Sequence, residues 1–173
     1  MLRVLARLHD GVTRLTFWGA AISVFYLTAI TAYEVVSRYF FRAPSDWAPD
    51  TSAVAFAFIA FLAAPELTRH SGHAAMTFVV EGASPAVSRW MTRLGLSISA
   101  VVCLVLTWFG GIEAGRQIAG NVAMIAATPI PKWIVTGAIV YGLASSALYF
   151  IRHLLASFFP SNKDASKWSG TFS

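Results

Sequence analysis

Residues 34–50 read EVVSRYFFRAPSDWAPD, a polar stretch that separates the first long apolar segment of the chain from the second. Glu34 and Arg38 are four residues apart, so they share one face of a helix and can pair. Pro44 favours a turn and disfavours a continuing helix. The stretch therefore predicts the end of one transmembrane helix, a tight hairpin at residues 43–45 and the start of the next helix.

Aromatic residues surround this predicted hairpin. Tyr39, Phe40 and Phe41 precede the turn, and Trp47 follows it. Tyrosine and tryptophan are enriched where membrane-spanning helices meet water. We therefore expect the hairpin to lie at the surface of a bilayer.

The composition is that of a membrane protein. Of the 173 residues, 57% are hydrophobic and 12% are charged, against about 25% charged residues in a soluble domain. The formal net charge is +5, but the basic residues are scattered at the ends of apolar segments and form no run that would bind nucleic acid. We expect one membrane domain over residues 1–173 and no nucleic-acid partner.

Four apolar segments are long enough to cross a bilayer. Residues 15–33 and 94–112 each hold nineteen uncharged positions, or about 28 Å of helix, close to the thickness of a hydrocarbon core. The sequence therefore predicts an all-α membrane protein. Its four transmembrane helices are expected at about residues 15–41, 47–68, 89–116 and 132–157.

The segments outside these spans have their own patterns. Residues 2–14 carry a basic stripe and an apolar stripe, which predicts an amphipathic helix lying in the headgroup layer; the alternative is that they extend the first span. The first apolar run is too long for a signal peptide, so we expect a retained helix. Residues 74–80 are too short to span and predict a short amphipathic segment between helices 2 and 3. Residues 117–131 predict a loop at the interface, and residues 160–173 a disordered tail.

Small residues recur at helical spacing on three of the spans. Such stripes allow neighbouring helices to approach closely. The stripes are Ala53, Ala57, Ala60 and Ala64; Gly95, Ser99 and Cys103; and Ala138, Gly142 and Ser146. We expect them to pack helices together, with bulky residues such as Phe56, Phe61 and Trp108 facing a partner or lipid.

The distribution of charge predicts the orientation. With four spans, the N-terminus, residues 68–93 and the C-terminal tail share one side of the membrane. That side holds nine of the 13 lysine and arginine residues, while the acidic residues divide evenly. By the positive-inside rule, both termini lie in the cytoplasm.

The residues that could carry redox or metal chemistry are poorly placed for it. His9, His70, His73 and His153 all lie outside the apolar cores of the spans, whereas a membrane haem needs two facing ligands at depth. Cys103 stands alone and has no metal-site spacing. We therefore expect no catalytic residue, no cofactor and no metal.

The acidic residues give no sign of a transport path within the chain. Glu34, Glu66 and Glu113 lie near the ends of spans, each with an arginine three or four residues further on. A charge at mid-membrane would indicate a proton or ion relay, but end positions favour pairing at the water boundary. No nucleotide-binding or nucleophile motif is present. The pattern indicates a membrane module that serves a partner.

Three stretches resemble the small membrane subunit of TRAP transporters, the DctQ/SiaQ family. The first is residues 34–41, EVVSRYFF, followed by Trp47 and an acidic position. The second is RHSGH at residues 69–73, followed by AAMTFVV, and the third is TPIPKW at residues 128–133. The resemblance covers roughly residues 15–155 in matching order. The chain departs from the family where Trp47 is followed by Ala-Pro-Asp rather than two glutamates.

The resemblance implies a role in uptake. TRAP systems import organic acids with a periplasmic substrate-binding protein (DctP/SiaP-type), a large elevator-type membrane subunit (DctM/SiaM-type) and this small subunit, which braces the large one and helps to dock the binding protein. It implies a multi-pass protein of the bacterial inner membrane and sodium symport as the class of transport. The residues it suggests as structural or partner contacts are Glu34, Arg38, Tyr39, Trp47, Arg69, Gly72, His73, Pro129, Pro131 and Trp133.

Three other classes of membrane protein share some of these features. The small subunit of tripartite tricarboxylate transporters also has four spans, but the Gly-His loop and the Pro-x-Pro-Lys-Trp stretch favour the TRAP family. A haem-bearing anchor of a respiratory oxidoreductase is the main alternative, and the positions of the histidines argue against it. A self-contained channel would need a polar stripe through a span, which the sequence does not have.

Overall fold

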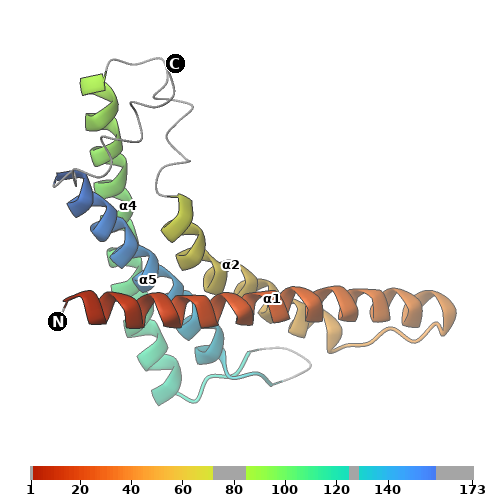
Figure 1. The fold of residues 1–173 in the computed structure, drawn as a ribbon. Coiled ribbons are helices and arrows are strands. Elements are labelled where there is room, and N and C mark those ends of the chain that lie inside the picture. The colour runs from red at the N-terminus through yellow and green to blue at the C-terminus, as the bar shows by residue number, and fades with distance from the viewer. Residues whose placement is uncertain (1, 72–84, 125–128, 159–173) are drawn as a thin grey trace, which may run out of the picture.

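The structure, a computed structural model, describes residues 2–71, 85–124 and 129–158 (Figure 1). It contains four long helices in these residues: α1 (Leu2–Phe40), α2 (Ala48–Ser71), α4 (Pro85–Ala119) and α5 (Lys132–Phe158). Each is long and apolar enough to cross a membrane. The predicted all-α membrane protein with four membrane-spanning helices is confirmed.

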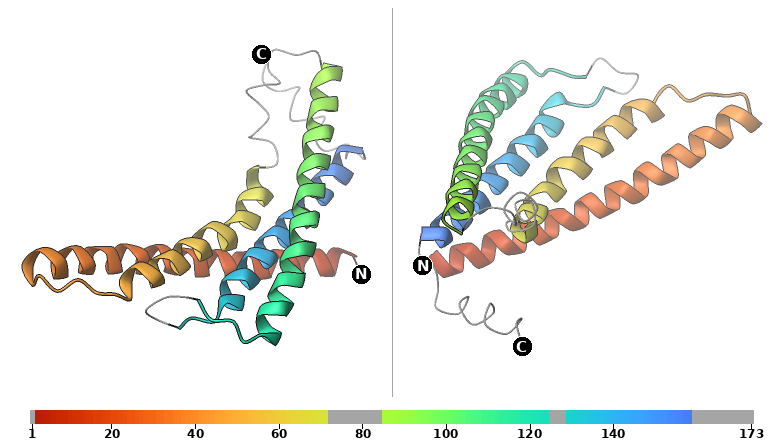
Figure 2. Two further views of the ribbon diagram at one scale, coloured as in Figure 1. Left: turned by 180° about the vertical axis from the view of Figure 1, so that it is seen from behind. Right: turned by 90° about the horizontal axis from the view of Figure 1, so that it is seen from above.

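The helices are arranged as a single layer, in the order α1, α2, α5, α4. Helix α1 packs on α2, α2 packs on α5, and α5 packs on α4. Figure 2 shows the four helices side by side from above, close together near the start of α1 and splayed apart toward the loops that follow α1 and α4. Helix α1 runs at a steep angle to α4 (Figure 1). The layer therefore has a narrow end, where α1 and α4 begin and α5 ends, and a wide end at the two loops.

Helix α5 is the most enclosed of the four, since it packs on α2 and α4 and also contacts α1 through Tyr149 and Arg152. In the most apolar stretch of α5, 28% of the residues are buried, against 11% in each of the other helices. The buried residues of α5 are small or polar: Gly142, Ser145, Ser146, Ala147 and Tyr149. A helix with this composition packs closely against its neighbours without needing a large apolar core.

The crossing of α2 and α5 depends on one proline and one glycine. Pro65 lies inside α2 and is fully buried. Because proline has no N–H, the carbonyl of Phe61 loses its usual helical donor. Gly142 of α5 lies directly against that carbonyl, and a Cβ at this position would overlap the carbonyl oxygen. Only glycine allows the two backbones to come this close, where a Cα–H group can approach the unpaired carbonyl.

The predicted small-residue stripe is buried at two of its three positions on α5, half-buried on α4, and half-buried at only two of its four positions on α2. Gly142 and Ser146 are buried, as expected, but Ala53 and Ala60 of α2 are exposed. The small residues of α2 that are buried are instead Ala48 and Ala55. The reason is that α2 lies between α1 and α5, so it packs along two faces and the regular alanine spacing marks neither of them.

No break separates the N-terminal segment from the first span. Helix α1 is continuous for 39 residues, about 58 Å, nearly twice the thickness of a hydrocarbon core. Residues 2–14 therefore continue into the first span without a break, as in the alternative, and their position in the headgroup layer stays a prediction. Gly11 has open space around it and does not bend the helix. The expected segment at residues 74–80 and the tail lie outside the described residues.

Candidate functional site

Glu34 organises the hairpin at the wide end of the layer. Its Oε1 accepts a hydrogen bond from Arg38 Nη2 at 3.0 Å, which confirms the pair predicted from their spacing. Its Oε2 accepts from the backbone N–H of Ser45 at 3.3 Å and from the Ser45 hydroxyl. One carboxylate thus holds the last turn of α1 and the turn of the hairpin together.

The end of α1 is closed by its own residues. The backbone N–H of Phe41 donates to the Ser37 carbonyl at 3.1 Å, and the Ser37 hydroxyl donates to the Ala43 carbonyl at 2.6 Å. Arg42 takes a left-handed conformation with φ 50°, which is unfavourable for a residue with a Cβ and needs such support. The connection from α1 to α2 is therefore a tied hairpin rather than a loose loop.

Aromatic side chains and a cavity lie beside this hairpin. The rings of Tyr33 and Trp47 have centroids 6.1 Å apart. Tyr39 is 77% exposed and Trp47 is 43% exposed. A cavity of about 330 Å³ opens between α1 and α2. Its lining includes Glu34, Arg38, Tyr39, Ala48, Pro49 and Ser52. The exposed rings, the ion pair and the cavity form one continuous surface.

The loop before α5 lies at the same end of the layer. Its two sides meet in one isolated antiparallel bridge: Met124 N–H donates to the Ile130 carbonyl at 2.9 Å, and Lys132 N–H donates to the Val122 carbonyl at 3.1 Å. The sequence predicted the loop but not this pairing. Pro131 forms the bridge with Ala123.

This loop reaches toward α1 and α2. Ile130 lines an apolar cavity of about 310 Å³ together with Tyr26 of α1 and Phe58 of α2. Pro129 and Pro131 are exposed on either side of Ile130, and Trp133 at the start of α5 is 43% exposed. The structure therefore brings the predicted residues of both loops to one end of the layer.

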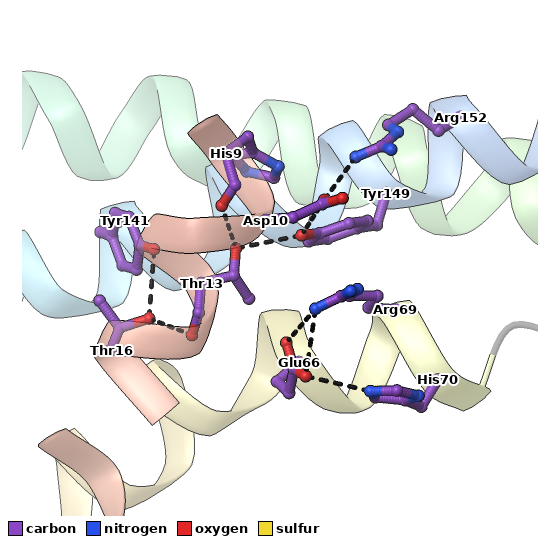
Figure 3. A network of polar contacts seen from close by, with 10 residues as sticks. All are labelled: His9, Asp10, Thr13, Thr16, Glu66, Arg69, His70, Tyr141, Tyr149 and Arg152. Atoms are coloured by element: carbon purple, nitrogen blue, oxygen red, sulfur yellow. Dashed lines mark hydrogen bonds and ion pairs between the residues drawn. The ribbon is translucent and has the colours of Figure 1, made fainter. Parts of the chain in front are cut away.

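A polar network joins α1 to α5 at the narrow end (Figure 3). Arg152 Nη1 lies 2.9 Å from Asp10 Oδ1. The Tyr149 hydroxyl lies 2.9 Å from the same carboxylate oxygen and 3.1 Å from Thr13 Oγ1. Thr13 in turn donates to the His9 carbonyl at 2.9 Å. Thr13 is completely buried and Tyr149 is 2% exposed, so these polar groups need the partners that they find.

A second polar contact joins α1 to α5 further along the two helices. The hydroxyls of Thr16 and Tyr141 lie 3.2 Å apart. The ring of His9 lies against that of Tyr149, with centroids 4.8 Å apart. We call the set Asp10, Thr13, Tyr149 and Arg152 the α1–α5 network.

Helix α2 adds charged residues beside the network. Glu66 lies 3.3 Å from Arg69 and 3.0 Å from His70. Figure 3 shows these three residues on α2, next to the α1–α5 network. Of the three predicted contact residues in this part of the chain, Arg69 lies in this group at the narrow end, whereas Gly72 and His73 lie outside the described residues. Arg93 of α4 donates to the hydroxyl of Ser157 at 3.0 Å and to its carbonyl at 2.8 Å.

The expected pairing of glutamates near helix ends is only partly correct. Glu34 and Glu66 pair with arginines on the next turn, but Glu113 instead accepts a hydrogen bond from Gln117 at 3.1 Å. Gln117 is buried, and its amide oxygen accepts from the Thr136 hydroxyl at 2.8 Å. Glu113 therefore supports a contact between α4 and α5.

Sequence reasoning missed the α1–α5 network. Its long-range contacts join residues 136–142 positions apart, which no local spacing predicts. A weak signal existed, because Asp10 with Thr13 and Tyr149 with Arg152 each place two polar groups three apart on a helix end.

The arrangement of these polar groups suits helix association. Over the described ranges, no group of three or more His, Cys, Asp or Glu side chains could hold a metal ion. The clusters lie at the two ends of the layer, and their side chains are occupied with one another. The fold and these sites define a multi-pass α-helical membrane protein whose polar clusters tie its helices together.

The family follows from comparison with known proteins. The family described as "Tripartite ATP-independent periplasmic transporters, DctQ component" matches residues 27–159. The chain belongs to this family and is a component of a TRAP transporter. A search of curated proteins finds no match. The family does not favour the alternative of a haem-bearing anchor subunit.

Proposed function

We propose that this chain is the small, non-catalytic permease subunit that braces the large DctM/SiaM-type membrane subunit of its transporter. In this proposal it also helps to dock a DctP/SiaP-type binding protein during ion-coupled uptake of an organic acid, with sodium as the coupling ion. The whole chain forms one domain in the bacterial inner membrane, and both termini lie in the cytoplasm.

The observation that carries the proposal is the open, single-layer arrangement of the helices. Large apolar side chains are exposed on α1, α2 and α4, among them Phe25 at 77%, Phe56 at 66% and Trp108 at 71%. The four described helices, arranged in one layer, enclose no path for a substrate among themselves. An apolar surface of this extent fits lipid on one face and a membrane partner on the other.

The wide end of the layer supports docking of a binding protein. The hairpin is held by Glu34 and carries the exposed aromatic residues Tyr39 and Trp47. Exposed tyrosine and tryptophan on a rigid support are frequent energetic centres of protein interfaces. The charge distribution favours the periplasmic side for this end.

Purification from native membranes tests the proposed bracing of the large membrane subunit. A tagged copy of the chain is extracted in mild detergent, and the co-purifying proteins are identified by mass spectrometry. We expect one large, many-spanning subunit in a stoichiometric amount. Recovery of the chain alone, or with a haem subunit that shows a Soret band, would contradict the proposal.

Docking is tested separately, with the assembled complex and its binding protein. Trp47→Ala and Arg38→Ala are expected to leave assembly intact. Trp47→Ala is expected to weaken binding-protein affinity by about 30-fold, which corresponds to the loss of about 2 kcal/mol at an interface hot spot. Trp90→Ala, which removes another exposed tryptophan at the narrow end, is the matched control and should have no effect. If both hairpin variants assemble and transport normally, the hairpin is not the docking site.

A further inference from the structure

The first turns of α1 present three different sides. One side packs on α5 through Asp10 and Thr13. A second side is apolar and exposed, with Leu8 at 64%, Val12 at 47% and Leu15 at 72%. The basic residues Arg7 and Arg14 share a face, because positions seven apart fall on nearly the same side of a helix, and this face borders the side of Asp10, which is one turn from each.

Arg7 and Arg14 are both exposed, and the carboxylate nearest to them in the chain is that of Asp10. Neither takes part in an ion pair over the described residues. The nearest acidic group, Asp10, is already paired with Arg152 at 2.9 Å. Glu66, the other acidic residue placed at this end, is paired with Arg69 and His70. Within the described chain, the basic side of α1 therefore forms no ion pair with a protein anion.

The position of this basic side along α1 matches the bilayer surface. Arg14 directly precedes the uncharged run of residues 15–33, which is about as long as a hydrocarbon core is thick. Arg7 lies about 10 Å further along the helix axis. A headgroup layer is roughly 5–8 Å thick, so both arginines reach it together only if α1 is inclined. The steep angle between α1 and α4 fits such an inclination (Figure 1).

We propose that Arg7 and Arg14 bind the phosphate groups of anionic phospholipids at the narrow end of the helix layer. The apolar side formed by Leu8, Val12 and Leu15 sets the depth of the helix in the same leaflet. The α1–α5 network pairs Asp10 with Arg152, so that the charge of the two arginines faces the lipid. This proposal rests on membrane insertion and on the side chains of α1, and it is independent of the proposed brace and docking roles.

Lipid selectivity of the full-length chain, with any subunit that co-purifies, tests the proposal. The protein is reconstituted in phosphatidylcholine, and the association of spin-labelled phosphatidylglycerol is compared with that of spin-labelled phosphatidylcholine. An arginine near an anionic surface contributes about a fivefold preference, equivalent to about 1 kcal/mol. We expect Arg7→Gln/Arg14→Gln to lose most of the preference for phosphatidylglycerol, a loss of about fivefold or more.

The control variant is Arg42→Gln/Arg116→Gln, which removes the same charge from two exposed arginines at the wide end. It should keep most of the preference. Equal losses in the two variants would show a simple effect of net charge and overturn the proposal. So would an unchanged preference in Arg7→Gln/Arg14→Gln, or a preference that is present in the isolated chain but absent when a co-purified subunit covers α1. Circular dichroism of each variant checks that the helices form.

Discussion

Helix α1 has a carboxylate side chain near each end, Asp10 and Glu34, and the two stabilise different parts of the structure. Glu34 binds Arg38 and Ser45, which are four and eleven residues away in the chain. Asp10 binds Tyr149 and Arg152, which are 139 and 142 residues away. The first carboxylate closes a turn, whereas the second ties the first helix to the last. The same type of residue on the same helix thus serves local structure at one end and tertiary structure at the other.

This difference explains the splayed shape of the layer. At the narrow end α1 is joined to α5 directly through the α1–α5 network, although α2 lies between them along most of the layer. At the wide end α1 is joined to α2 through the hairpin. The helices therefore converge where the long-range contacts lie and diverge toward the loops (Figure 2).

The largest effect on stability is expected at the crossing of α2 and α5, which holds the two inner helices of the layer together. Gly142→Ala places a methyl group on the Phe61 carbonyl and should destabilise the protein by about 3 kcal/mol or more, the upper end of the cost of overpacking, because the clash is with backbone. Gly137→Ala meets open space and should stabilise α5 by up to about 1 kcal/mol, because alanine favours helix. Melting temperatures in detergent measure both, and a shift of the same sign in the two variants would show that the crossing does not require glycine.

The next effect concerns the narrow end. Asp10→Ala leaves the nearly buried Tyr149 hydroxyl with Thr13 alone and removes the anion beside Arg152. We expect a loss of about 1–3 kcal/mol. A double-mutant cycle with Arg152→Gln should give a coupling energy of at least about 0.5 kcal/mol. Arg116→Gln, an exposed arginine on α4, is the control and should not couple to Asp10. Additive losses for Asp10 and Arg152 would contradict a shared network.

The smallest effect on global stability is expected at the wide end. Glu34→Gln removes the ion pair with Arg38 and weakens the bonds to Ser45, but each of these contacts is local. Amide hydrogen exchange over residues 41–47 should become faster while the melting temperature changes less than in Asp10→Ala. Asp46→Asn alters an exposed acidic residue of the same hairpin and serves as the control. If Glu34→Gln melts as early as Asp10→Ala, the contrast between the two ends is wrong.

Much of the fold was predictable from local patterns. Hydropathy predicted the four membrane-spanning helices, and the spacing of Glu34 and Arg38 predicted their pair. Local patterns failed where a residue's partner is far along the chain. Two of the four alanines in the predicted stripe of α2 are exposed, because the spacing does not tell which helices flank α2. The continuity of α1 was missed because its first turns are held by α5, so that an amphipathic pattern alone suggested a separate helix.

The amino-acid order sufficed for the class of protein, the family resemblance, the charge asymmetry and the position of the hairpin, because each depends on residues close together in the chain. The order of the helices in the layer required the folded structure. So did the carbonyl of Phe61 against Gly142 and the meeting of Asp10 with Tyr149 and Arg152. These contacts join residues separated by about half of the chain or more, and only the packing of α5 against the other helices brings them together.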